Sequence, residues 1–151
     1  MRIGMKASAK ALWRLHDKRL AIALAMLLLC PAQARASFET DLLDRWYILL
    51  GQANESGLAG LLSPRATIRL NDIGVTQTRS EFLDSMKEWR AAIKGGNIRY
   101  RIETTSAGAA IALVCYEFRS NDLMTRESFR IAQGLITRSE QTTIAEGCRK
   151  F

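Results

Sequence analysis

A short apolar run marks the N-terminal part of the chain. Residues 20–30 (LAIALAMLLLC) are apolar without interruption, whereas a membrane-spanning helix needs roughly 20 such residues. Basic residues precede this run, and Pro31 and the A-x-A pattern of residues 34–36 follow it. This order is typical of a secretory signal peptide. We therefore expect residues 1–36 to be a signal peptide cleaved after Ala36, and residues 37–151 to form a single periplasmic or secreted domain.

Apolar residues then recur at helical spacing in three segments. The pattern predicts a first helix over residues 40–52 and a short second one over 55–62, ended by Ser63-Pro64. A third helix is predicted from Thr78 to Lys94, opened by a capping box between Thr78 and Glu81. Its apolar face consists of Phe82, Met86, Trp89 and Ile93.

Strand patterns fall into a short hairpin and a long meander. Residues 66–70 and 75–77 flank a turn and predict the hairpin. After Gly96 the period changes to two, and turn residues separate four longer strands over 98–103, 109–119, 123–131 and 135–145. The segment 109–119 is largely apolar, so we expect a central strand covered on both faces. The fold class is therefore α+β, with a mostly antiparallel sheet after about three helices.

The charge of the chain is concentrated in the predicted leader. The formal net charge is +7, but residues 1–36 hold seven basic residues and one acidic residue, which leaves 15 basic and 14 acidic residues beyond them. The mature domain is thus nearly neutral, and the basic character does not indicate a nucleic-acid partner. We also expect no membrane association after cleavage.

Histidine and cysteine restrict the chemistry further. The only histidine, His16, lies in the predicted leader, which excludes histidine-dependent triads and imidazole metal sites from the mature domain. No cofactor or metal site is predicted. Cys115 and Cys148 remain after cleavage, and an oxidising compartment favours a disulfide between them, closing a loop of 34 residues. The alternative is a buried free Cys115 and an unpaired Cys148.

Three stretches of the chain resemble a known superfamily. LAGLLSPRATI at 58–68, TRSEFL at 78–83 and QGLI at 133–136 are similar to the nuclear-transport-factor-2-like superfamily, which includes SnoaL-like cyclases and ketosteroid isomerase. The resemblance covers about residues 40–145. It implies a sheet curved around the helices as a cone with an internal pocket. A fold of this kind does not by itself define an activity.

The isomerase-like members of that superfamily imply three site positions. Their helix-one tyrosine falls on Trp46, their strand carboxylate falls on Leu70, and their third acid falls near Glu127. Neither Trp46 nor Leu70 can perform the required chemistry, although Tyr47 and Asp72 lie close by, so we do not expect the isomerase mechanism. Asp72 or Glu127 could act as a single general base if partly buried. The alternative is that both are surface charges.

Two further features leave alternatives open. Trp46 and Trp89 either line an apolar cavity with Tyr47 and Leu70 or fill the core. Two strands each carry a pair of arginines on one face, Arg99 with Arg101 and Arg126 with Arg130. If these strands are neighbours, the arginines form a basic patch suited to an anion. The alternative, which we favour, is a solvated face balanced by Glu103, Glu117 and Glu127.

The sequence therefore favours an exported, pocket-bearing domain that binds a small apolar ligand or a protein partner without catalysis. One alternative is a small isomerase, cyclase or dehydratase-type enzyme that uses a single carboxylate. Another is a homodimeric interaction module whose exposed sheet face forms the contact, as is common among relatives of this fold.

Overall fold

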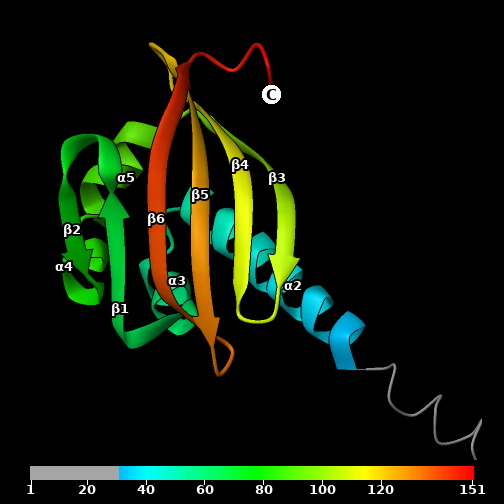
Figure 1. The fold of residues 1–151 in the computed structure, drawn as a ribbon. Coiled ribbons are helices and arrows are strands. Elements are labelled where there is room, and N and C mark those ends of the chain that lie inside the picture. Colours follow the sequence, from blue (N-terminus) through cyan, green and yellow to red (C-terminus); the bar gives the residue numbers. More distant parts are fainter. Residues whose placement is uncertain (1–30) are drawn as a thin grey trace, which may run out of the picture. The chain divides into compact units, whose positions relative to one another are not determined.

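The computed structural model describes the backbone of residues 31–151 and the side chains of residues 38–151 (Figure 1). The apolar run of the predicted leader lies outside the described residues. The helices are α2 (Pro31–Gly51), α3 (Glu55–Leu61), α4 (Arg79–Asp84) and α5 (Met86–Ile93), with a 3-10 turn η1 (Asn71–Ile73). The strands are β1 (Leu62–Leu70), β2 (Val75–Thr78), β3 (Asn97–Ser106), β4 (Ala109–Glu117), β5 (Asp122–Ala132) and β6 (Leu135–Glu146). None of the helices within the described range is long and apolar enough to cross a membrane.

The first described helix is longer than the pattern predicted. The expected start near residue 40 is wrong, because α2 is continuous from Pro31 to Gly51. The segment that precedes residue 40 is rich in alanine and contains no glycine, so nothing in it opposes helix formation. The helix α3 follows the prediction closely, and the Asn54 side chain caps it by accepting a hydrogen bond from the Gly57 N–H at 2.9 Å.

The third predicted helix is two helices. The capping box is confirmed: the Glu81 N–H donates to Thr78 Oγ1, and the Thr78 N–H donates to Glu81 Oε2 at 2.7 Å. The helix then breaks at Ser85, whose hydroxyl donates to the Phe82 carbonyl oxygen at 2.7 Å. A serine hydroxyl that takes a backbone acceptor in this way competes with the helical hydrogen bonds. Gly95, in the left-handed region at φ 75°, ends α5 as predicted.

One six-stranded sheet, in the order β2-β1-β6-β5-β4-β3, lies against the helices (Figure 1). The four-stranded antiparallel meander and the β1–β2 hairpin are both confirmed. β1 also pairs in parallel with β6, a contact that joins the hairpin to the meander and makes the sheet mixed. The α+β fold with its mostly antiparallel, curved sheet is as expected from the sequence.

The central strand β4 is covered on both faces. Ala112, Val114 and Tyr116 pack into the main core on the helix side, whereas Leu113 and Cys115 belong to a second cluster on the opposite face. The C-terminal tail covers that second cluster, because Cys148 forms a disulfide with Cys115. We call the face that carries this cluster the back face of the sheet.

The arginine pairs of the sequence also lie on the back face, and acidic residues balance them. Arg99 forms an ion pair with Glu117 at 2.7 Å, and Arg126 pairs with Glu103 at 3.2 Å. The strands β3 and β5 are not neighbours, since β4 lies between them. The expectation that Glu127 contributes to this balance is wrong, because its side chain is buried and binds Tyr47 of α2 on the helix side. The alternation of β5 carries Arg126 and Glu127 to opposite faces.

Candidate functional site

A cavity of about 220 Å³ lies between the helices and the sheet. α2 contributes Trp46 and Leu50 to its wall, and α5 contributes Met86 and Trp89. Five aromatic side chains line it: Trp46, Phe82, Trp89, Tyr116 and Phe118. The polar lining residues are Gln77, Ser85, Glu127, Ser139 and Gln141. A concave site that is mostly apolar, with a few converging polar groups, is typical of small-molecule sites.

The aromatic rings of the wall are packed against one another. The rings of Trp46 and Phe82 stack at 5.5 Å between centroids. The ring of Trp89 is nearly perpendicular to those of Tyr116 and Phe118, at 5.7 and 5.9 Å. These contacts hold the rings in fixed orientations, so the wall is organised before any molecule enters.

Glu127 is the one carboxylate in the wall. Its side chain is only 2% exposed, and three hydroxyl groups converge on it. Tyr116 donates to Oε1 at 2.6 Å, Thr125 donates to the same oxygen at 3.1 Å, and Tyr47 donates to Oε2 at 3.0 Å. A carboxylate offers about four acceptor positions, so this arrangement satisfies most of them and leaves room for one more donor.

Burial raises the pKa of Glu127 above its ordinary value, and the hydrogen bonds from Tyr116, Tyr47 and Thr125 oppose part of that rise. The pKa values of Tyr116 and Tyr47 are also raised well above 10.0, first by burial and then by the neighbouring carboxylate. Both phenols therefore remain hydrogen-bond donors over the whole physiological pH range. The site thus combines one carboxyl group of elevated pKa with permanent donors.

The two tryptophans of the wall differ in their hydrogen bonding. Trp89 donates from Nε1 to the Leu50 carbonyl oxygen at 2.7 Å, which ties α5 to the end of α2. The indole nitrogen of Trp46 is buried and has no hydrogen-bond partner in the structure. A buried donor without a partner costs about 1–3 kcal/mol.

The candidates from the sequence fall in different places. Trp46, Leu70 and Trp89 line the cavity, but Tyr47 is not part of its wall and instead reaches Glu127 from α2. Asp72 lies away from the cavity, where it is exposed and accepts a hydrogen bond from the Thr143 N–H at 2.7 Å. That bond lowers the pKa of Asp72. Asp72 therefore fastens η1 to β6, and Glu127 is the carboxyl group at the cavity.

Sequence reasoning missed Tyr116, Ser139 and Gln141 as parts of the wall. A signal for the orientation of Glu127 was present, because Leu123, Phe129 and Ile131 alternate with Arg126 and Arg130 along the strand. That alternation assigns Glu127 to the apolar side. No comparable local signal marks Ser139, since the neighbouring residues of β6 alternate between polar types.

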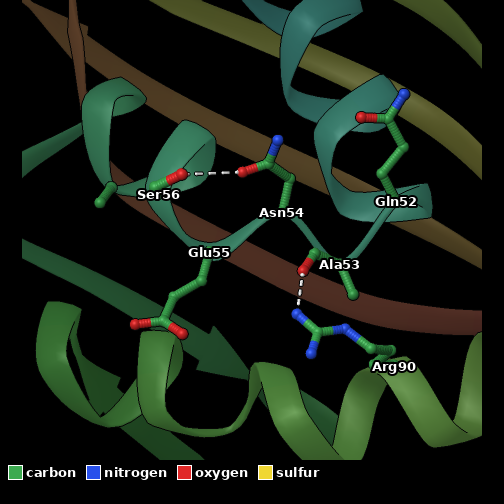
Figure 2. A pocket seen from close by; sticks show the side chains of 7 residues that line it. Gln52, Ala53, Asn54, Glu55, Ser56 and Arg90 are labelled. Atoms are coloured by element: carbon green, nitrogen blue, oxygen red, sulfur yellow. Dashed lines mark hydrogen bonds between the residues drawn. The ribbon is translucent and has the colours of Figure 1, made fainter.

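A second, wider depression of about 620 Å³ lies at the surface where α2 is joined to α3 (Figure 2). Two of its polar side chains, those of Asn54 and Arg90, bind the local backbone. Arg90 donates to the Ala53 carbonyl oxygen at 2.9 Å, and Ser56 donates to the side-chain oxygen of Asn54 at 3.1 Å (Figure 2). The same Asn54 oxygen caps α3 by accepting from the Gly57 N–H. We therefore assign these residues to the stability of the α2–α3 connection. Within residues 38–151, no group of three or more His, Cys, Asp or Glu side chains is placed to hold a metal ion.

Comparison with known proteins identifies the fold. No protein-family model matches the chain, and no curated protein matches it. Among solved structures, an NTF-2 like protein of unknown function from Burkholderia xenovorans is similar, with a TM-score of 0.63, 12% identity and coverage of 76% of this chain and 91% of that one. The chain has the nuclear-transport-factor-2-like fold.

Two other similar structures are described by reference to ketosteroid isomerase. A putative ketosteroid isomerase from Kribbella flavida matches with a TM-score of 0.61, 15% identity and coverage of 73% of this chain and 80% of that one. A protein with a ketosteroid isomerase-like fold from Catenulispora acidiphila, solved in complex with trimethylamine, matches with a TM-score of 0.55, 15% identity and coverage of 67% and 83%. At these identities the similarity establishes the fold and not an activity.

Proposed function

We propose that this protein is an exported domain that binds a small, largely apolar molecule bearing one polar group, in the cavity beside Glu127. The observation that supports it is an aromatic cavity of about 220 Å³ with a single buried carboxylate in its wall. Apolar ligand surface removed from water contributes about 25 cal/mol per Å². The free acceptor position on Glu127 then orients the polar end of the ligand.

The ionisable groups of the cavity wall fit binding without catalysis. Among the described residues that line it, only Glu127 and Tyr116 are ionisable, and they are hydrogen-bonded to each other. The carboxylate accepts two further hydrogen bonds, from the hydroxyls of Tyr47 and Thr125. Proton transfer to or from a substrate needs an acid or base that can exchange its proton with that substrate. Here three protein hydroxyls already occupy most of the acceptor positions of the base.

An enzyme of isomerase or cyclase type is the second candidate. The raised pKa of Glu127 favours it, because burial moves the carboxyl group toward the pKa range in which a general base is most effective. One similar structure is that of a putative ketosteroid isomerase. NMR of a bound ligand in D₂O distinguishes binding alone from an isomerase or cyclase activity. Exchange of its carbon-bound hydrogens, lost in Glu127→Gln, would support the enzyme.

Filling the cavity is the direct test of binding. Ser139 lies in the cavity wall on β6, so Ser139→Leu should occupy part of the space and abolish binding of small apolar probes in ligand-observed NMR. The matched control is Ser128→Leu, because Ser128 pairs with Glu140 on the back face and does not line the cavity. Unchanged binding by Ser139→Leu, with both variants folded, would refute the assignment of the cavity as the binding site.

Export is tested by the mature mass of the protein. The Cys115–Cys148 disulfide suits an oxidising compartment and supports the proposal of export. Native mass spectrometry of protein recovered from the periplasm should give a chain that begins at Ser37. Recovery of exported protein that still begins at Met1 would contradict cleavage. The subunit count from the same spectrum tests the homodimer, which stays a prediction.

A further inference from the structure

The carboxylate in the cavity wall has no cationic partner in the described part of the chain. The three ion pairs found there involve Glu117, Glu103 and Glu140. Glu127 instead is stabilised by neutral hydroxyl groups, and no basic side chain contributes to the shift of its pKa. A buried carboxylate is costly unless an opposite charge compensates it. The protein therefore places an uncompensated acidic group at the wall of a cavity.

The hydrogen-bond pattern suits the ionised form of this group. Each of the three hydroxyls, from Tyr47, Tyr116 and Thr125, has one proton and donates it to Glu127. Hydroxyl donors placed in this way stabilise the ionised form of a carboxyl group. Burial opposes this state by raising the pKa of Glu127. A positive charge in the cavity would act in the other direction and favour the ionised carboxylate.

The aromatic side chains of the wall also attract a positively charged ligand. The faces of aromatic rings carry negative charge density and attract cations within about 6 Å of the ring centroid. Five rings line the cavity, and Trp89 stands nearly perpendicular to Tyr116 and Phe118. The T-shaped contacts fix these cavity-lining rings against one another, and fixed aromatic rings of this kind bind alkylammonium groups in aromatic cages.

We propose that the cavity selects a small organic cation, an amine or quaternary ammonium compound, over a neutral molecule of the same shape. This inference rests on the proposed binding function and names its ligand class. The cation contacts the carboxylate of Glu127 at one side and the rings of Trp89 and Tyr116 at the others. Its alkyl groups bury apolar surface against Leu50, Ile68 and Met86 in the same wall.

Two compounds that differ only in charge provide the test. Choline and 3,3-dimethylbutan-1-ol have the same shape, with a quaternary nitrogen in one and a quaternary carbon in the other. We measure the affinity of the protein produced from the full-length sequence for each compound by ligand-observed NMR and calorimetry. Choline should bind about tenfold more tightly or better, the range expected of a desolvated cation–aromatic contact. Its N-methyl proton resonances should move upfield because of the ring currents of the wall.

Two variants test whether the preference for choline depends on the carboxylate of Glu127. Glu127→Gln keeps the shape of the side chain and should reduce the preference to the part that the aromatic rings supply. Glu88→Gln removes the same charge from an exposed position on α5 and should leave the preference unchanged. Circular dichroism checks that both variants fold. The comparison of the two compounds on the unaltered protein needs no variant.

Equal affinity of the unaltered protein for both compounds would overturn the inference, and so would a preference that is undiminished in Glu127→Gln. Binding of the neutral alcohol alone, blocked by Ser139→Leu, would overturn cation selectivity while leaving the binding function intact. If neither compound binds at millimolar concentration, the inference also fails. The binding function would then be judged by the wider set of probes used with Ser139→Leu.

Discussion

Replacing Cys115 and Cys148 together by alanine should lower the free energy of unfolding by about 3–4 kcal/mol. The disulfide joins residues separated by 33 positions, so it restricts the unfolded chain substantially. It also anchors the tail on the back face, where the Phe151 ring lies 4.9 Å from the Arg99 guanidinium. Urea denaturation followed by tryptophan fluorescence measures the loss.

Reduction of the unaltered protein is the matched control for this variant. A reducing agent should produce a similar loss in the unaltered protein and no further loss in the double alanine variant. Ligand binding at saturating concentration should persist in the folded variant, because the disulfide and the cavity lie on opposite faces of the sheet. A loss below about 1 kcal/mol would mean that other contacts anchor the tail.

Local patterns predicted the elements well where a single physical signal dominates. The alternation after Gly96 predicted the meander, and the Thr78–Glu81 spacing predicted a capping box that the structure contains. The break at Ser85 and the parallel pairing of β1 with β6 were not predicted. At Ser85 the side-chain hydroxyl competes with backbone N–H groups for a helical carbonyl oxygen. The pairing of β1 with β6 joins two strands that lie far apart in the sequence.

The candidate site likewise combines features that local sequence patterns predict with features that depend on long-range contacts. Trp46 and Tyr47 are adjacent, and the side chains of adjacent helical residues point about 100° apart around the helix axis. Both are nevertheless buried, since α2 packs a wide stripe against the sheet. Trp46 lines the cavity and Tyr47 reaches the carboxylate. The network around Glu127 joins α2, β4 and β5, and its assembly depends on long-range register, which no local window of the sequence contains.

The network also explains why a carboxylate can remain buried on a sheet strand. The neighbour of Glu127 across the β4–β5 ladder is Ala112, whose small side chain leaves space above the strand for the Tyr116 ring and its hydroxyl. The rings of Tyr47 and Tyr100 stack at 4.4 Å, and Tyr100 donates in turn to Asp44 at 2.9 Å. The hydroxyl donors are thus held in place by packing before they meet the carboxylate, which reduces the cost of burying it.

Tyr116→Phe should lower the free energy of unfolding by about 2 kcal/mol at neutral pH, since it removes a short hydrogen bond to a buried carboxyl group. The loss should shrink as the pH falls. Tyr116 lowers the pKa of Glu127 against the effect of burial, so the variant raises that pKa further above the ordinary value of 4.5. A carboxyl group whose pKa is raised by folding destabilises the fold as the pH increases through the interval between its unfolded and folded values. The variant widens this interval between the two pKa values, so its extra destabilisation appears as the pH rises. At a pH below the interval both proteins bury a protonated Glu127, and this part of the loss disappears.

The measurement is urea denaturation of both proteins from pH 4 to pH 8. Tyr100→Phe is the matched control, because its hydroxyl donates to Asp44 in a partly exposed position and its removal should cost less at neutral pH. A loss in Tyr116→Phe that stays constant or grows as the pH falls would contradict the ionised, hydroxyl-supported state of Glu127. The same state underlies cation selectivity, because only an ionised carboxylate attracts a positive charge into the cavity.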